Sequence, residues 1–262
     1  MERERSERQR AIFITGAASG IGRATAELFA SRGWFVGGFD VNRAALEALS
    51  RELGPGAGLF GPLDVTDRAA VLAAVEEFGR ATGGQLDLLF NNAGIDAKGP
   101  FESMPWEQIV AVVNVNLLAG MSLIHAAIPL LRATPNSLCF STSSASAIFG
   151  TAGLAVYSAT KHAVKGLTEA LAVELAAHGV RAADVLPGII ETGMLPAEAK
   201  AVFPKEGMWR VMPPSAVAEA VWSAYESKKL HWYVPEELAE YDVQITADPE
   251  GTRDSRLSGS SF

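Results

Sequence analysis

The sequence predicts an α/β protein built on one doubly wound, mostly parallel β-sheet with helices on both faces. Short apolar runs alternate with amphipathic stretches along most of the chain, and glycine-rich or polar motifs follow several of these runs at their carboxyl ends. Repeated strand–helix units favour right-handed crossovers and a parallel sheet. Ligands of such sheets bind beyond the carboxyl ends of the strands, so we expect the functional site at that edge.

Six apolar runs have the length and composition of buried strands, and each but the last leads into a helical pattern or a loop before one. They lie at 11–15, 34–39, 57–63, 86–90, 137–142 and 180–186.

The stretch 106–132 has no charged residue between Glu107 and Arg132 and is long enough to cross a bilayer. Its asparagines, with Ser122, His125 and Pro129, would be awkward in lipid. We therefore expect a buried helix that can bend, packed between the sheet and a partner subunit.

Composition is consistent with one globular domain over residues 11–247, since the chain has 262 residues, of which 48% are hydrophobic. The charged start, 1–10, predicts a disordered tail and not an export signal, which leaves the cytoplasm as the default location. Residues 248–262, rich in Ser, Gly and charge, predict a flexible C-terminal tail.

The net charge of −8 argues against nucleic-acid and anionic-membrane partners. The single cysteine, Cys139, lies in an apolar run and is expected to be buried in a reducing compartment. The four histidines show no metal-ligand spacing and no carboxylate partner pattern, so we expect no metal site.

Tyr157 and Lys161 lie four residues apart in a helical pattern, which places both side chains on one helix face. A cation close to a phenol favours the phenolate, so the pair can exchange a proton near neutral pH. Ser144, at the end of the run 137–142, can hold a substrate oxygen, with Ser143 as the alternative. Without further motifs, such a pair more commonly marks a partly exposed helix face.

A glycine-rich turn, TGAASGIG, joins the first strand to the first helix. Its glycines let the backbone approach a pyrophosphate held by amide groups at the helix N-terminus. The residues assigned to this cofactor contact are Gly16, Ser19, Gly20, Ile21 and Gly22.

Two acidic residues follow the next strands. Asp40 can accept hydrogen bonds from the adenosine ribose hydroxyls and repel a 2′-phosphate, which favours NAD over NADP, although Arg43 is near enough to receive a phosphate. Asp64, with the backbone N–H of Val65, can frame an adenine edge. Alternatively Asp64 caps the next helix, a task for which Asp67 and Thr66 compete.

The tetrapeptide NNAG, at 91–94, follows the fourth strand. Its side-chain amides can tie neighbouring strands together, while Ala93 and Gly94 let a ribose lie close to the backbone. Asn92, Ala93 and Gly94 are therefore assigned to the cofactor site, with an Asn-rich turn as the alternative.

Together, TGAASGIG, Asp64, NNAG, VNLLAG, Ser144, YSATK and PGIIET make the chain resemble the short-chain dehydrogenase/reductase family, in its compact single-domain branch. The resemblance covers about residues 11–192. It implies a Rossmann-like, seven-stranded sheet and an NAD(P)-dependent oxidoreductase acting on CH–OH groups.

The resemblance also implies individual roles. Tyr157 would be the general acid/base, Ser144 would hold the reacting oxygen, and Lys161 would both lower the phenol pKa and bind the nicotinamide ribose. Asn116 would hold a water of a proton relay, with Asn114 or a merely structural amide as alternatives. The residues expected around the nicotinamide are Pro187, Gly188, Ile190 and Thr192.

Substrate contacts are expected from the segments around the crevice. The candidate walls are Ile95 with Asp96, Phe149, Leu154, and the stretch 189–212, which contains Met194. That stretch mixes apolar residues with charge and proline, as a mobile lid would, or it packs on the body as a surface helix. The pocket would prefer an apolar or ring-bearing alcohol.

The resulting hypothesis is an NAD-dependent enzyme that interconverts a secondary alcohol and a ketone. A non-catalytic NAD-binding sensor or scaffold on the same fold is the alternative. The stretch HWYVPEELAEYD stands where many family members have a glycine-rich final strand, so a homodimer through helices 106–132 and 154–177 is preferred over a tetramer.

Overall fold

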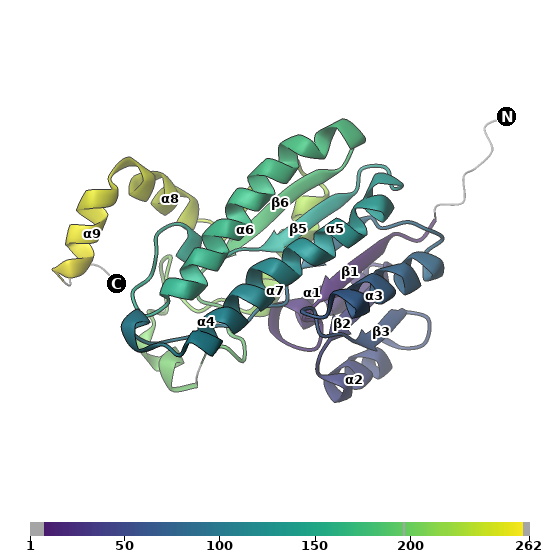
Figure 1. Ribbon diagram of the computed structural model, residues 1–262, viewed down its shortest axis with the longest axis horizontal. Helices are drawn as coiled ribbons and strands as arrows, with labels where there is room; N and C mark the ends of the chain where they lie inside the picture. Colours follow the sequence, from purple (N-terminus) through teal and green to yellow (C-terminus); the bar gives the residue numbers. More distant parts are fainter. Residues whose placement is uncertain (1–7, 196, 259–262) are drawn as a thin grey trace.

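The sheet contains seven parallel strands within the described residues, 8–195 and 197–258 of the computed structural model, in the order β3-β2-β1-β4-β5-β6-β7 (Figure 1). Their bounds are Ala11–Thr15 (β1), Phe35–Asp40 (β2), Gly58–Pro62 (β3), Leu88–Asn91 (β4), Leu138–Thr142 (β5), Arg181–Pro187 (β6) and His231–Val234 (β7). The order reverses between β1 and β4, which creates the crevice of a doubly wound sheet. The predicted fold class is confirmed.

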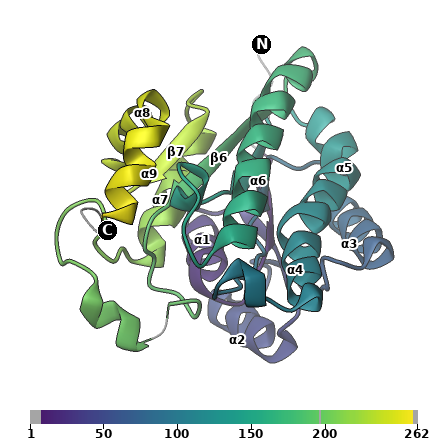
Figure 2. The same cartoon turned by 60° about the vertical axis from the view of Figure 1, so that its left-hand side comes forward.

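Helices cover both faces of the sheet, as Figures 1 and 2 show. They are α1 (Gly20–Ser31), α2 (Arg43–Leu53), α3 (Arg68–Ala81), α4 (Trp106–Val113), α5 (Ala119–Arg132), α6 (Ala155–Glu174), α7 (Pro214–Tyr225), α8 (Leu238–Ala247) and α9 (Pro249–Leu257). Side chains of α1, α2 and α7 share one buried cluster with the sheet, and those of α3, α5 and α6 share a second. The alternating apolar pattern of the chain thus produces two cores, one on each face.

The six strands predicted from apolar runs are confirmed, and the seventh is formed by His231–Val234. Three of its four residues are only half-buried, because β7 is the edge strand beside β6. A short edge strand buries too little apolar surface to produce a strong sequence pattern. Cys139, on β5, is buried as expected.

The long apolar stretch forms a continuous helix in which α4 and α5 are joined by a π-helical turn, Asn114–Leu118. By length and composition it is apolar enough to cross a membrane, yet α5 packs against α3 and β4. The inner face is buried as expected, whereas Trp106, Leu118 and Met121 are exposed on the outer face, where packing against a partner subunit stays a prediction. One face of a surface helix suffices to fill the core.

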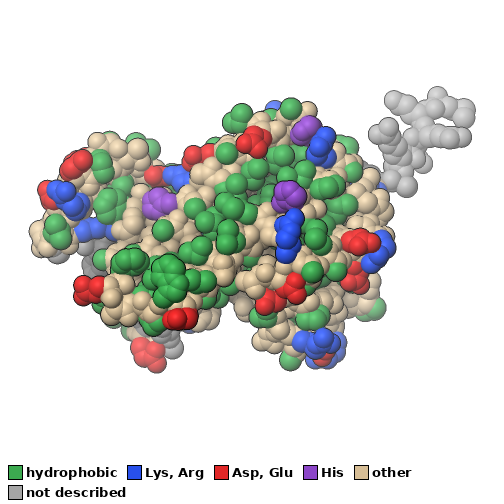
Figure 3. Space-filling view, viewed as in Figure 1, with side chains coloured by type: hydrophobic (Ala, Val, Ile, Leu, Met, Phe, Trp, Pro, Cys, Tyr) green, Lys and Arg blue, Asp and Glu red, His purple; other side chains and the backbone are tan. Residues whose placement is uncertain are grey.

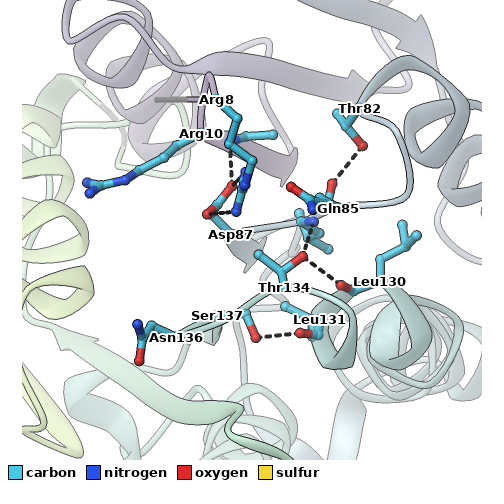
Figure 4. Close-up of polar contacts among 12 residues, drawn as sticks. Arg8, Arg10, Thr82, Gln85, Asp87, Leu130, Leu131, Thr134, Asn136 and Ser137 are labelled. Atoms are coloured by element: carbon cyan, nitrogen blue, oxygen red, sulfur yellow. Dashed lines mark hydrogen bonds and ion pairs between the residues drawn. The ribbon is translucent and has the colours of Figure 1, made fainter. Parts of the chain in front are cut away.

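The start of the described chain is held at the amino ends of the strands, opposite the carboxyl edge (Figure 4). Both guanidinium nitrogens of Arg8 donate to the buried carboxylate of Asp87 at 2.7 Å, and the same carboxylate accepts the N–H of Ala11 at 2.9 Å. Residues 1–7 of the expected tail lie outside the described residues. Residue 8 differs from the expectation, because a buried carboxylate needs a cationic partner.

The expected C-terminal tail also differs, since residues 249–257 form α9, which follows α8 at one end of the molecule (Figure 1). Asp248 caps this helix by accepting the N–H of Gly251, and Pro249 occupies its first position. These two helix-start signals outweigh the polar composition of the segment. Residues 259–262 lie outside the described residues.

Candidate active site

A cavity of about 570 Å³ opens at the carboxyl edge of the sheet and is lined by nearly all of the predicted site residues. The predicted residues on its walls are Gly16, Ser19, Gly20, Ile21, Asp40, Asp64, Val65, Asn92, Ala93, Gly94, Ile95, Asp96, Ser144, Leu154, Tyr157, Lys161, Pro187, Gly188, Ile190, Thr192 and Met194. Segments far apart in the chain therefore meet at one place. This volume is in the usual range for small-molecule and cofactor sites.

The glycine-rich turn forms the floor of the cavity beneath the N-terminus of α1. Gly16 and Gly20 have φ angles of +69° and +52°, which favour glycine. Gly22 does not line the cavity, because it packs under the turn, where a Cβ atom would lie 2.1 Å from the carbonyl oxygen of Gly16.

The N-terminus of α1 has no side-chain cap, since the Ser19 side chain makes no hydrogen bond to the first helical turn. Uncapped N–H groups at a helix N-terminus attract phosphate oxygens. The turn therefore fits the pyrophosphate of a dinucleotide.

Asp40 is fixed at the end of β2 by two backbone hydrogen bonds. One carboxylate oxygen accepts the N–H of Ala18 at 3.1 Å, and the other accepts the N–H of Asn42 at 2.9 Å. The remaining acceptor positions of a carboxylate on the cavity wall can serve two vicinal hydroxyls. Arg43 is not one of the described residues that line the cavity.

Of the two tasks considered for Asp64, capping of α3 falls to Asp67, and contact with adenine stays a prediction. Asp67 caps α3 by accepting the N–H groups of Ala69 and Ala70. Asp64 lines the cavity and accepts the hydroxyl and the N–H of Thr66, hydrogen bonds that lower the pKa of its carboxyl. Asp64 thus remains ionised and available as an acceptor beside Val65.

Asn92 joins three strands. Its amide nitrogen donates to the carbonyl oxygen of Thr15 on β1 at 3.0 Å, and its amide oxygen accepts the hydroxyl of Thr142 on β5. The hydroxyl of Thr15 in turn accepts the backbone N–H groups of Asn92 and Ala93. These bonds fix the spacing of β1, β4 and β5 under the cavity, which is the tying role expected of this motif.

Tyr157 and Lys161 lie on the same face of α6, with the Lys161 ammonium 5.5 Å from the centre of the tyrosine ring. Lys161 is buried and donates to the carbonyl oxygen of Thr142 at 2.8 Å. Burial lowers the pKa of Lys161 from 10.5 to about 8. The amine can therefore change its charge within the range where enzymes commonly work.

The expectation that Lys161 lowers the phenol pKa is not met in this structure. Burial raises the pKa of Tyr157 above its ordinary value, a hydrogen bond with Ser144 opposes this, and the nearby carboxylate of Asp96 adds to the increase. The physical reason is that the ammonium lies over the ring and bonds to Thr142, while desolvation acts directly on the phenolate.

Ser144 and Ser143 point in different directions. The Ser143 hydroxyl donates to the backbone carbonyl oxygen of Lys161 at 2.9 Å, so its proton is used inside the fold. The Ser144 oxygen accepts the N–H of Ser146 and lies within hydrogen-bonding reach of Tyr157. Of the two serines, Ser144 is the one placed beside the phenol.

Asn116 lies behind the cavity wall, in the π-helical turn. Its amide oxygen accepts the N–H of Ile95, and its amide nitrogen donates to the carbonyl oxygen of Ile95, both at 2.8 Å, and to Thr160 at 3.3 Å. A Cβ atom on Gly94 would approach both Asn116 and the Lys161 ammonium. The side chain therefore clamps the backbone beside Gly94, and its donors are already used.

The segment after β6 forms the far end of the cavity. Gly188 N–H donates to Val234 on β7, and Ile190 forms a bridge with Met212. Thr192 lies against Gly20, whose added Cβ would be 3.0 Å from the threonine methyl group. The segment thus reaches back to the glycine-rich turn and forms part of the cavity wall.

The substrate walls are partly as predicted. Ile95, Leu154 and Met194 line the cavity, but Phe149 does not, because it packs with Met208 and Trp209 beside α8. Within 189–212, Met194 and Leu195 line the cavity, as expected of a lid. Met208 and Trp209 pack on the body of the protein, as expected of the alternative, a packed surface segment.

Several cavity residues were not predicted as part of the site, among them Val41, Leu63 and Val115. Val41 directly follows Asp40, and Leu63 directly precedes Asp64. Their position beside a predicted acidic residue was the available signal. Val115 precedes Asn116 in the same way.

His231 differs from the expectation of no carboxylate partner. Its Nδ1 lies 2.7 Å from the buried carboxylate of Asp184, and its Nε2 lies 3.4 Å from Glu169. Burial raises the pKa of Asp184, and the hydrogen bond from His231 opposes this. The group joins β6, β7 and α6 away from the cavity.

Comparison with known proteins places this geometry in context. The family model described as short chain dehydrogenase matches residues 10–202. The 3-oxoacyl-(acyl-carrier-protein) reductase of Thermotoga maritima is 36% identical, over 80% of this chain and 87% of the relative. The cyclohexanol dehydrogenase of an Acinetobacter species is 34% identical, over 80% and 84%.

A solved structure shares the same architecture. The 3-ketoacyl-(acyl-carrier-protein) reductase of Brucella melitensis, complexed with NADH, superposes with a TM-score of 0.79 at 29% identity, covering 88% of this chain and 100% of the other.

Proposed function

Because the chain belongs to the short-chain dehydrogenase family, we propose that it is an NAD-dependent oxidoreductase that interconverts a secondary alcohol and a ketone. The observation that carries the proposal is the meeting of Ser144, Tyr157 and Lys161 in the cavity whose floor is the glycine-rich turn. A proton-exchanging group and a dinucleotide site on one cavity are what such a reaction needs.

Each residue has a defined task in this proposal. Ser144 holds the substrate oxygen, and Tyr157 takes the hydroxyl proton during oxidation and returns it during reduction. Lys161 supplies positive charge beside the ring and holds a ribose hydroxyl. NAD, when bound, supplies the hydride acceptor. Asn116 acts by fixing the backbone at Ile95. A relay water at this place would therefore be held by the surrounding backbone and not by the Asn116 side chain.

The preference for NAD rests on Asp40. Its carboxylate lies on the cavity wall, is held by backbone N–H groups and has no cation among its hydrogen-bond partners in the described chain. A 2′-phosphate at that position would meet an uncompensated negative charge. Val65, Ile190 and Thr192 would hold the adenine and nicotinamide ends.

The proposed substrate is a small, ring-bearing or otherwise apolar alcohol. Ile95, Leu154, Met194 and Leu195 give the cavity apolar walls near Tyr157, and one relative is named for its action on cyclohexanol. The proposed location is the cytoplasm, and nucleic acid and membranes are not proposed partners, given the net charge of −8.

We propose a two-fold dimer through α4, α5 and α6, with a tetramer as the less favoured alternative. Hydrophobic side chains gather over these helices in Figure 3. Trp106 and Leu118 are 70% and 52% exposed on this surface. Apolar patches of this kind usually mark protein interfaces. A Leu118→Lys variant should therefore elute as a smaller particle than the wild type in size-exclusion chromatography with light scattering.

Turnover tests the enzymatic proposal directly. The purified protein, given NAD and a panel of cyclic secondary alcohols, should form reduced nicotinamide, and Tyr157→Phe should lower the rate about a hundredfold or more. The variant should keep its NAD affinity, which calorimetry measures. NAD binding without turnover on any alcohol or ketone would favour the sensor or scaffold alternative instead.

A further inference from the structure

The C-terminal helix α9 reaches toward the substrate side of the molecule through one side chain, Arg256. One terminal nitrogen of its guanidinium donates to the carbonyl oxygen of Gly150 at 3.3 Å, and the other donates to the hydroxyl of Tyr241 at 2.9 Å. The same guanidinium lies 4.6 Å from the centre of the Phe149 ring. Arg256 thus contacts the 149–150 backbone and α8 at once.

The first of these contacts concerns one wall of the cavity. Phe149 and Gly150 lie between Ser146 and Leu154, which both line the cavity, and between Ser144 and Tyr157 in the chain. The same loop is held at its other end, where Gly153 O accepts the N–H of Gly99 at 3.0 Å. Arg256 therefore supports this loop from the side that faces away from the cavity.

The second contact leads to the segment that follows β6. The ring of Tyr241 packs edge-on against Trp209, with the ring centres 5.4 Å apart. Three residues later, Met212 exchanges backbone hydrogen bonds with Ile189 and Glu191, at the base of the segment that carries Met194. Tyr241 thus connects Arg256 to Trp209, in the segment that leads to Met212 and its bonds with Ile189 and Glu191.

Both walls share a small core with α8. Ala147, Ile148, Leu186, Leu238 and Ile245 form a separate buried cluster, against which Phe149, Met208, Trp209 and Tyr241 pack. Figure 2 shows α8 and α9 together beside β7, next to the segment that follows β6. Arg256 lies over the aromatic border of this cluster.

We propose that Arg256 is a positioning residue that sets the shape of the substrate pocket by holding its two walls together from outside. The inference rests on the proposed function, because it assigns those walls to the substrate. Arg256 touches neither substrate nor cofactor and acts through Phe149, Gly150 and Tyr241. A fork of donors over an aromatic face suits arginine and cannot be reproduced by lysine.

The test compares Arg256→Ala with Arg253→Ala. Arg253 is on the same helix, its side chain is 60% exposed, and within the described chain it forms an ion pair with the adjacent Asp254. Hydrogen exchange of backbone amides, which needs no substrate, should be about tenfold faster in Arg256→Ala over 145–154 and 203–212 and unchanged over 15–22. Arg253→Ala should match the wild type throughout.

Kinetics give the second measurement. On the alcohol that the wild type uses best, Arg256→Ala should raise KM about tenfold while kcat changes less than about threefold, and NAD affinity should not change. The KM of Arg256→Lys should fall between the values of the wild type and Arg256→Ala, because lysine keeps the cation but not the fork of donors. Tyr241→Phe, which removes one hydroxyl, should speed exchange over 203–212 alone and serves if Arg256→Ala does not fold.

The outcomes separate the two proposals. Unchanged exchange in both wall segments, or equal acceleration over 15–22, would overturn the role of Arg256 whatever the enzyme does. A wild type without turnover would overturn the proposed function, while the exchange data would still show whether Arg256 holds the two segments.

Discussion

The Lys161 ammonium lies over the Tyr157 ring, 5.5 Å from its centre, and its hydrogen bond goes to the backbone of Thr142. Burial has the largest effect on the phenol and keeps the pKa of Tyr157 above its ordinary value. The proton affinity of the proposed acid/base is then set by a balance between desolvation, Ser144 and Asp96, each of which can be changed separately.

Asp96→Asn should move the acid limb of the pH profile for alcohol oxidation to lower pH. The reason is that the Asp96 carboxylate raises the pKa of Tyr157, and its removal stabilises the phenolate that acts as base. Lys98→Ala is the matched variant with the opposite sign, because Lys98 lies 3.0 Å from Asp96 and partly neutralises it. The pH dependence of kcat/KM measures both, and shifts in the same direction would contradict the argument.

Asp40→Ala should weaken NAD binding about tenfold or more and bring NADP affinity closer to that of NAD. The carboxylate would supply two acceptors to the ribose and a repulsive charge to a 2′-phosphate. Calorimetric titration with both dinucleotides measures the change, with Arg43→Ala as the control outside the cavity lining. Tighter binding of NADP than NAD by the wild type would remove Asp40 from this role.

Lys161→Met should change how stability depends on alkaline pH. The pKa of Lys161 is about 8 in the folded protein because of burial and 10.5 in its ordinary state. Between these values the unfolded chain binds more protons than the folded one, so the unfolding free energy of the wild type rises with pH.

The variant lacks this contribution, which amounts to at most roughly 3 kcal/mol across that window. Urea unfolding at several pH values measures the difference between the two proteins. Parallel curves from neutral pH upward would show that the amine is not desolvated as the structure has it.

Arg8→Ala should lower the unfolding free energy by about 1–2 kcal/mol without changing NAD affinity. The Asp87 side chain is 2% exposed and would lose its cationic partner, although its hydrogen bond from Ala11 N–H would remain. Because the Arg8 side chain is partly exposed to solvent, the loss of unfolding free energy is limited. Arg80→Ala is the control, because it breaks a fully surface pair with Glu76 and should cost less than about 0.5 kcal/mol. Altered NAD binding would contradict the separation of this cluster from the cavity.

The sequence was sufficient for six strands of the sheet and for the turns that line the cavity beside them, because both depend on strong local patterns. Buried parallel strands are apolar throughout, and the glycine-rich turn, Asp40 and the NNAG motif each follow such a strand directly. The helix spacing of Tyr157 and Lys161 likewise fixed which face they share.

Other features depend on contacts between distant segments, which no local pattern encodes. Phe149 was assigned to the cavity because it lies between Ser144 and Tyr157 in the chain. In the structure it contacts Arg256 and packs beside α8 instead. The polar composition of α9 concealed its capping signals. The phenol pKa depends on burial and on the positions of Ser144 and Asp96, which spacing along a helix does not determine.

The π-helical turn at Asn114–Leu118 holds one residue more than a regular α-helical path of the same rise would need. The extra residue rotates the side chains of α4 relative to those of α5. Along this one continuous helix, α4 can therefore face α6 while α5 faces α3 and β4. Deleting a single position there would rotate everything before it by roughly 100°, and Asn116 could no longer meet both backbone groups of Ile95. Segment length at this turn should accordingly be less tolerant of change than the identity of exposed residues such as Leu118.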